Sequence, residues 1–169
     1  NTALKDLHCY SNELTTLDVS HNTALTDLYC YSNQLTNLDV TQNIVLTNLY
    51  CFANKLTILK ISGALVYLEC DYNQLTALDV SPSKNMVHLQ CQNNQLAVLD
   101  VSQNTALTTL YCFNNLLTSL DVSQNTNLTA LNCQSNKLYS LNLKNGNNTK
   151  LSTGNQISFR QNSGLFCIE

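Results

Sequence analysis

The sequence predicts a β-solenoid, in which short coils stack side by side and share one parallel sheet. Three observations support this fold class. Cysteine recurs in steps of 21, 21, 19, 21, 21 and 21 residues, at positions 9, 30, 51, 70, 91, 112 and 133. Apolar residues two positions apart, such as Leu7 and Cys9, alternate with other residues as they do in strands. An asparagine follows each pair, and asparagine is typical of turns. A fixed period of this length indicates stacked repeats.

Each unit consists of two similar halves. The first unit places Leu4, Leu7, Cys9 and Asn12 in its first half and repeats this spacing from Leu14 in its second half. We therefore expect a strand, a corner, an extended segment and a second corner in every coil. We expect little or no helix, because no apolar stripe has helical spacing. The seven units begin near residues 4, 25, 46, 65, 86, 107 and 128.

The chain of 169 residues has the size of one domain. Residues 1–150 are predicted to form the repeats. Residues 151–169 are predicted to form a C-terminal capping segment, in which Phe159 takes the position of the repeated cysteine. The chain opens on Asn1-Thr2-Ala3-Leu4, which copies the residues around the start of the second unit. We expect it to be a fragment of a longer protein, because a bare first coil would expose a strand edge.

The repeat is interrupted in two places. The unit from Leu46 is two residues short, and the loss falls in its second half around Gly63. The main sheet is therefore expected to continue through this unit. Pro82 lies before the unit from Met86, at a predicted corner, which suits a residue without a backbone N–H.

These units resemble a known family. The segment Leu25-Thr-Asp-Leu-Tyr-Cys-Tyr-Ser-Asn-Gln-Leu-Thr-Asn-Leu-Asp-Val resembles the leucine-rich repeat, and more narrowly the short Bacteroidetes-type repeat of secreted and surface proteins. Residues 162–168 are similar to the phrase that ends such arrays, with Ser163 in place of its proline. The resemblance covers residues 1 to about 150. It implies a right-handed solenoid with the parallel sheet on its concave face, and an extracellular or outer cell-surface location in a bacterium.

Eight cysteines in a secreted chain would normally suggest disulfides. The period argues against them, because the repeated thiols would point inward in parallel from strands about 4.8 Å apart. A disulfide needs Cβ atoms about 3.8 Å apart and suitable side-chain vectors. We predict a ladder of buried, reduced thiols, and we expect Cys167 to be buried too. A linear ladder also lacks the convergent ligands of a metal centre, so no metal site is predicted.

Aromatic residues gather at the outward positions of the first half-units. Seven of the eight tyrosines and two of the four phenylalanines lie there. Exposed apolar patches mark interaction sites, and tyrosine is common at binding hot spots. Cross-strand aromatic pairs also stabilise a sheet by about 0.2–1 kcal/mol each, so stacking alone is the alternative explanation. The predicted partner-binding residues are Tyr10, Tyr29, Tyr31, Tyr50, Phe52, Tyr67, Glu69, Asp71, Tyr72, Tyr111 and Phe113.

Polar residues interrupt the aromatic pattern in the fourth and fifth units. They form an acidic and amide centre at outward positions, made of Glu69, Asp71, Gln90 and Gln92. His88 is expected beside the two acids, and the group is interpreted as a solvated polar patch. At the start of the chain Asp6 and Asp27 are expected to be adjacent like charges, which His8 or a cationic partner would relieve.

Two further polar columns have structural interpretations. Asp18 and its equivalents in the second half-units are expected to cap turns. The complete column that begins at Asn12 and Asn33 is expected to form a buried ladder that bonds to backbone at one corner, because buried backbone groups must be paired.

Composition excludes several function classes. The net charge is −3, and the 8 Lys and Arg residues are scattered, which argues against nucleic-acid binding. No apolar run has the length of a membrane span. The three histidines lie in different units, and no catalytic constellation or cofactor motif occurs. We therefore predict that the chain is not an enzyme and carries no cofactor.

The resulting functional prediction is a non-catalytic protein-binding module of a bacterial surface or secreted protein. The family resemblance implies this role, with a host extracellular or serum protein as a possible partner in adhesion or immune evasion, and the aromatic columns agree with it. A glycan-binding module, with rings stacked on sugar faces, is the first alternative. A structural spacer without a ligand is the second.

Overall fold

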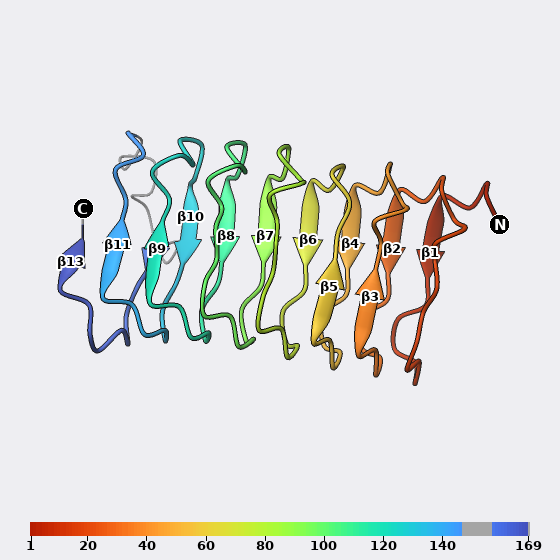
Figure 1. Cartoon of the computed structure of the whole chain (residues 1–169), viewed down its shortest axis with the longest axis horizontal. Coiled ribbons are helices and arrows are strands. Elements are labelled where there is room, and N and C mark those ends of the chain that lie inside the picture. The colour runs from red at the N-terminus through yellow and green to blue at the C-terminus, as the bar shows by residue number, and fades with distance from the viewer. Residues whose placement is uncertain (147–156, 169) are drawn as a thin grey trace.

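The chain winds through stacked coils, as the sequence predicts. The computed structural model describes residues 1–146 and 157–168, and Figure 1 shows the coils side by side from the N-terminus to the C-terminus. The described residues contain short strands and no helix. The predicted boundary between repeats and cap, at residues 150 and 151, lies outside the described residues and stays a prediction.

One continuous parallel sheet runs along the solenoid. Neighbouring strands pair in parallel, and each strand comes from the first half of a coil. In spatial order the strands are β1 (Asp6–His8), β2 (Asp27–Tyr29), β4 (Asn48–Tyr50), β6 (Tyr67–Glu69), β7 (His88–Gln90), β8 (Thr109–Tyr111), β10 (Ala130–Asn132) and β12 (Ile157–Ser158).

The register of this sheet follows the repeat. Leu28 pairs with Leu49, and Leu49 pairs with Leu68, so the shortened third unit causes no slip in the sheet. The shortening brings two corners together instead. A Cβ atom on Gly63 would lie 3.1 Å from the backbone oxygen of Pro82, so glycine suits this close approach between neighbouring coils.

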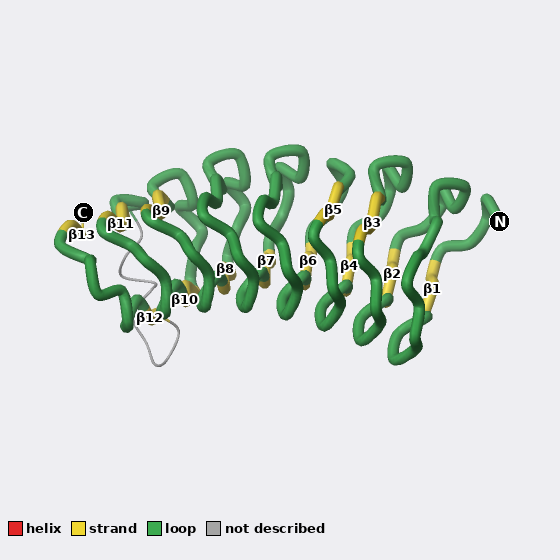
Figure 2. The backbone as a smooth tube through the Cα atoms, turned by 60° about the horizontal axis from the view of Figure 1, so that its bottom comes forward, coloured by secondary structure: helices red, strands yellow, loops and turns green. Residues whose placement is uncertain are grey.

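The second half-units form two smaller parallel sheets on the opposite side. One sheet pairs β3 (Asn37–Asp39) with β5 (Ile58–Lys60), and the other joins β9 (Ser119–Asp121), β11 (Ser140–Asn142) and β13 (Cys167–Ile168). Residues 77–79 and 98–100, between these sheets, form no strand. Figure 2 shows the two rows of strands on opposite sides of the coils.

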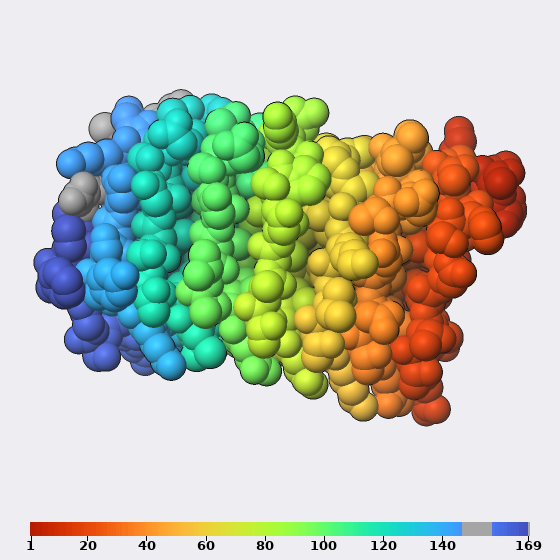
Figure 3. Space-filling model, in the orientation of Figure 1, coloured from red at the N-terminus to blue at the C-terminus, as the bar shows by residue number. Residues whose placement is uncertain are grey.

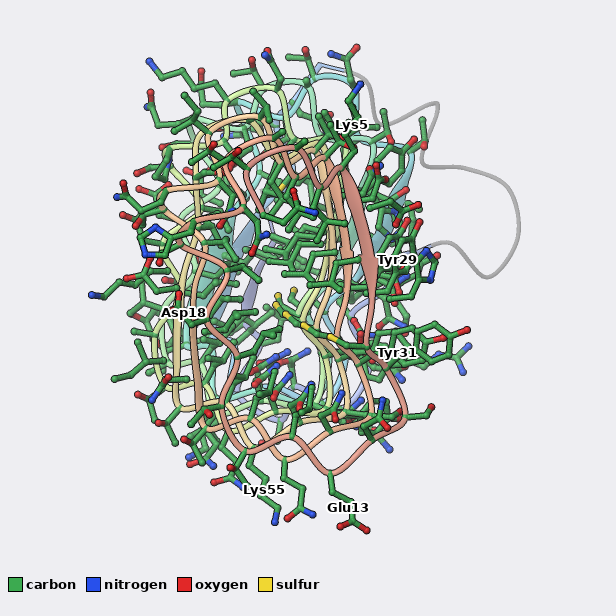
Figure 4. All side chains as sticks on the ribbon, turned by 90° about the vertical axis from the view of Figure 1, so that its right-hand side faces the viewer. Lys5, Glu13, Asp18, Tyr29, Tyr31 and Lys55 are labelled. Atoms are coloured by element: carbon green, nitrogen blue, oxygen red, sulfur yellow. The ribbon has the colours of Figure 1, made fainter. Side chains whose placement is uncertain are left out.

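The core is a set of columns that run through the stack. Leu28, Leu49, Cys30 and Cys51 are fully buried, and their equivalents in later coils continue the same columns. Figure 4 shows the sulfur atoms in a row in the interior. None of the eight cysteines, all of which lie in the described residues, forms a disulfide. Each coil buries its apolar edge against its neighbours, so adjacent coils are in close contact along the stack, as Figure 3 shows.

Two cysteines depart from the expected burial. Cys9 and Cys167 are only partly buried, whereas the six cysteines between them in the ladder are buried. Cys9 lies in the first described coil, which packs against another described coil on one side only. Cys167 lies in β13, at the outer edge of its three-stranded sheet. Burial of a thiol in this fold requires a coil on each side.

Asparagine columns satisfy the backbone at the corners. Asn115 shows the arrangement: its Nδ2 donates to the backbone oxygens of Cys91 and Cys112 at 3.0 and 3.1 Å, and its Oδ1 accepts from Leu96 N at 2.9 Å. This confirms the predicted buried ladder from the second coil onward, whereas Asn12 in the first coil is exposed. The buried members are Asn33, Asn54, Asn73, Asn94, Asn115 and Asn136, and Asn162 continues the column with equivalent bonds.

The aspartates of the second half-units cap turns, as predicted. Asp121 Oδ1 accepts a hydrogen bond from Ser123 N at 2.8 Å, and this bond keeps the pKa of the carboxyl below its usual value. The same bond occurs at Asp18, Asp39, Asp79 and Asp100.

Candidate functional site

The outward side of the eight-stranded sheet carries most of the aromatic residues. We call it the aromatic face; it comprises the outward residues of these strands and the residue after each repeated cysteine. Tyr29 and Tyr31 project from this side, and Asp18 projects from the opposite side (Figure 4). The predicted grouping of aromatic residues on one face is therefore present.

Six rings on this face form two stacked rows across the first three coils. In the His8 row the ring centroids of His8, Tyr29 and Tyr50 are separated by 4.3 and 4.7 Å. In the Tyr10 row the separations between Tyr10, Tyr31 and Phe52 are 4.5 and 4.4 Å. The planes within each row differ by 5–15°.

The stacking follows from the repeat. Equivalent residues in register lie about 4.8 Å apart, which is close to the usual distance between the ring centroids of stacked aromatic side chains. As a result, the ring faces inside each row contact one another, and the rows present ring edges and phenolic hydroxyls to solvent. Burial raises the pKa of Tyr29, Tyr31 and Tyr50, so these hydroxyls stay protonated and can donate hydrogen bonds at neutral pH.

The acids of the first two coils are paired. Asp6 Oδ1 lies 2.9 Å from His8 Nε2, so His8 in its protonated form makes an ion pair with Asp6. Asp27 accepts hydrogen bonds from Thr26 Oγ1 at 2.7 Å and from the amide of Asn48. Because Asp6 and Asp27 already have these partners, they need no added cation.

The acidic and amide centre has a different geometry. His88 Nε2 lies 2.9 Å from Gln90 Nε2 and 3.7 Å from Glu69 Oε1. Gln92 Nε2 donates to Gln90 Oε1 at 2.9 Å, so the side chains of the fifth coil form a chain of contacts. With the Gln90 oxygen accepting from Gln92, the Gln90 nitrogen donates to His88 Nε2, which is then the unprotonated ring nitrogen. Burial also lowers the pKa of His88, which favours the neutral ring.

Two members of this centre are not exposed as the sequence predicts. Asp71 is 7% exposed and Gln92 is 6% exposed, although both were expected to face solvent. Asp71 is a short side chain in the column between the longer Phe52 and Gln92. Burial raises the pKa of Asp71; burial first, and then the charge of Asp71, raise the pKa of Glu69. The centre is therefore a partly dehydrated pair of acids rather than a solvated patch.

The fourth coil also carries two exposed tyrosines. Tyr67 is 42% exposed, and its ring centroid lies 5.8 Å from that of His88. Tyr72 is 60% exposed and has a φ of 50°, an unfavourable conformation for a bulky residue. Tyr72 lies at the corner after the strand, so the structure places it beside the sheet rather than on a strand.

The remaining predicted residues lie apart. Tyr111 and Phe113 are partly buried in the sixth coil, and no ring contact joins them to another aromatic residue in residues 1–146 and 157–168. Gln90 and Gln92 of the fifth coil separate them from the stacked rows. The structure thus brings together nine of the predicted residues in coils one to four and leaves these two separate.

The described residues show no arrangement for catalysis or metal binding. No group of three or more His, Cys, Asp or Glu side chains among them could hold a metal ion. None of the residues that the structure describes forms a helix long and apolar enough to cross a bilayer.

Sequence reasoning missed one surface feature on the opposite side. A shallow depression of about 460 Å³ lies between the fourth and fifth coils, where the small sheets are interrupted. Its lining includes Ala77, Leu78 and Val98, and Val98 is 71% exposed. Ala77 and Val98 lie at positions where the other units mostly carry polar residues. This change from polar to apolar residues is the sequence feature that could have predicted the depression.

Comparison with known proteins identifies the fold. No protein-family model matches the sequence, and a search of curated proteins finds no match. Among solved structures, the functional domain of InlJ from Listeria monocytogenes is 37% identical, with a TM-score of 0.63 over 99% of this chain and 48% of that chain. A leucine-rich-repeat protein of Leptospira interrogans is 27% identical, with a TM-score of 0.77 over 98% of this chain and 42% of that chain. YopM from Yersinia enterocolitica, at 23% identity and a TM-score of 0.66 over 82% of this chain and 35% of that chain, shares the fold.

These similarities support a leucine-rich-repeat solenoid that resembles bacterial proteins. The InlJ structure is described as including a cysteine ladder, which is the feature found here. The chain spans less than half the length of each of these structures. The stacked coils provide an extended surface along the length of the solenoid.

Proposed function

From the leucine-rich-repeat fold of this chain, we propose that it is a protein-binding module whose aromatic face docks a partner protein. The proposal places the module in a bacterial cell-surface or secreted protein with repeats of the Bacteroidetes type. Its partner is a host or neighbouring extracellular protein, and its role is adhesion or immune evasion. Similarity to the solved bacterial structures supports the setting.

The observation that carries the proposal is the pair of stacked ring rows. Tyrosine hydroxyls and ring edges from three coils form one broad surface of mutually stacked rings. Rigid aromatic side chains lose little conformational entropy on binding, which is why they are frequent hot spots. A protein partner can cover such a surface, together with Tyr67 and Tyr72 on the fourth coil.

Glycan binding has less support from this geometry. Sugar rings pack on the exposed faces of aromatic rings. The faces of Tyr29 and Tyr31 are occupied by neighbouring rings on both sides, with centroid separations of 4.3–4.7 Å. The structural-spacer alternative is consistent with the stacking, so the test must separate binding from stability.

The test uses substitutions of one tyrosine from each stacked row. The immobilised chain would be offered purified serum and extracellular-matrix proteins individually, beside a glycan array. For a protein that binds, we expect Tyr31→Ala with Tyr50→Ala to weaken the Kd by at least about 30-fold, which corresponds to about 2 kcal/mol. The matched control is Ile58→Ser with Val98→Ser, which changes exposed apolar residues on the opposite side.

Circular dichroism would show that each variant remains folded before binding is compared. Undiminished binding of the tyrosine variant, or equal loss in the control, would contradict a role for the aromatic face. Glycan binding without protein binding would favour the first alternative. Failure to bind any protein or glycan would favour the spacer.

A further inference from the structure

We propose that the centre of the aromatic face is a subsite for an arginine side chain of the partner protein, held by Glu69 and Asp71. This inference rests on the proposed function and specifies the chemistry of the partner at one position. Three features favour arginine here: the charge of the two acids, a buried acceptor beside them and the geometry of the guanidinium group.

The centre holds two acids and no compensating cation. The outward residues of β1, β2, β4, β6, β7, β8 and β10 include no lysine or arginine. His88 lies on the neighbouring strand, but its Nε2 contacts Gln90, and burial lowers the pKa of its ring, which favours the neutral form. Asp71 is 7% exposed, and the side chain of Glu69 is 26% exposed. Carboxylates removed from water without a partner are unfavourable, so this pair favours a cation from outside.

An unpaired acceptor lies next to the acids. Gln92 is 6% exposed, its Nε2 donates to Gln90, and its Oε1 is buried without a hydrogen-bond partner. Gln92 and Asp71 both directly follow a repeated cysteine on neighbouring strands, so they stand in the same column about 4.8 Å apart. Six side-chain atoms of the described residues are buried in this way, and Gln92 Oε1 is the acceptor beside the two acids, where it can bind a donor from a partner.

An arginine side chain meets these requirements together. Its guanidinium offers five donors in one plane, enough for a carboxylate and for a nearby amide oxygen. Tyr67 lies on the same strand as Glu69, and Tyr50 pairs with Glu69 across the sheet, which allows a guanidinium to contact aromatic rings as well. A lysine ammonium lacks the planar fork, and no group of three metal ligands occurs in the described part of the chain.

Access begins at the more exposed acid. An incoming guanidinium would contact Glu69 first, and rotation of the Gln90 and Gln92 side chains would open the way to Asp71. Side-chain rotations of this kind are common when proteins associate. Asp71 also attracts the guanidinium without direct contact, because its charge is weakly screened where it is buried.

The test is a nuclear magnetic resonance titration of the labelled chain with N-acetyl-arginine amide. We expect weak but saturable shifts at the side chains of Glu69, Asp71 and Gln92. N-acetyl-citrulline amide, which has the same shape without the charge, should bind at least about tenfold more weakly. Glu69→Gln with Asp71→Asn should abolish the response. The matched control, Asp6→Asn with Asp27→Asn, removes two other acids of the same face and should leave it unchanged.

Three results would overturn the subsite: no saturable shifts at these residues, an equal response to the citrulline compound, or a response to calcium chloride stronger than that to arginine. The titration is independent of the tyrosine variants described above. If arginine fails to bind while Tyr31 and Tyr50 still control protein binding, the subsite is wrong and the proposed function stands. If arginine binds at Glu69 while the tyrosine variants leave protein binding unchanged, the proposed function is wrong.

Discussion

The ring of Tyr29 lies parallel to the ring of Tyr50, with centroids 4.7 Å apart and 6° between their planes. The two residues pair across β2 and β4, so the stacking is a direct consequence of the register. Each ring therefore serves both the stability of the sheet and the shape of the aromatic face. Experiments on this face must separate these two contributions.

Substitutions at Tyr29 can make this separation. Tyr29→Phe keeps the stacked ring and removes only the hydroxyl, so we expect the free energy of unfolding to change by less than about 0.5 kcal/mol. Tyr29→Ala removes contacts with rings on both sides and should cost about 1–2 kcal/mol. Urea-induced unfolding followed by circular dichroism measures both. Equal costs for the two variants would show that the stacking contributes little.

The asparagine ladder should be among the most sensitive parts of the fold. Asn115→Ala would leave Leu96 N and the oxygens of Cys91 and Cys112 without their side-chain partner. We expect a loss of about 2–4 kcal/mol in the free energy of unfolding, because buried polar groups left unpaired carry most of their desolvation cost. Gln124→Ala, at an exposed position of the same coil, is the control and should change it by less than about 0.5 kcal/mol.

The thiols should differ in reactivity according to their place in the ladder. Burial raises the pKa of Cys133 to about 12 and raises the pKa of Cys51, Cys70, Cys91 and Cys112 well above the usual value. A thiol with a raised pKa holds little reactive thiolate at about pH 8. Alkylation with iodoacetamide, mapped by mass spectrometry, should modify Cys9 and Cys167 first and the other six only after unfolding. Rapid modification of Cys70 in the folded chain would contradict the buried ladder.

The acids Asp71 and Asp121 should have opposite effects on the pH dependence of stability. Burial raises the pKa of Asp71 in the fold, so its ionised form is unfavourable above that pKa, and the cost disappears below the unfolded value of about 3.9. We therefore expect Asp71→Asn to raise the Tm by a few degrees at neutral pH and to have little effect at acidic pH.

Asp121 provides the matched control for this measurement. The hydrogen bond from Ser123 N lowers its pKa, so its ionised form stabilises the fold above the unfolded value, and this contribution is lost as the pH falls through the folded value. Asp121→Asn should lower the Tm at neutral pH and have little effect below the folded pKa. Thermal unfolding from acidic to neutral pH measures both variants. A lower Tm for Asp71→Asn at neutral pH would show that Asp71 is not a destabilising charge.

Much of the candidate site could be predicted from the repeat. The period placed Tyr29, Tyr50 and Glu69 on the same outward column, and the register of β2, β4 and β6 confirms that column. It also suggested His8 as one group that would relieve the charges of Asp6 and Asp27, and His8 Nε2 lies 2.9 Å from Asp6 Oδ1. The burial of Asp71 could not be predicted in this way, because a period assigns a side chain to a face without saying whether its neighbours cover it.

The sequence by itself determined the coil, the reduced cysteine ladder and the asparagine ladder. Each depends only on equivalent residues recurring at a nearly constant interval, so stacking in register brings like side chains together. The tertiary structure decided how the face meets solvent: which ring faces are occupied, which acid is covered and which amide oxygen remains unpaired. These properties depend on the length and conformation of side chains in adjacent coils, and the spacing of residues along the chain does not specify either.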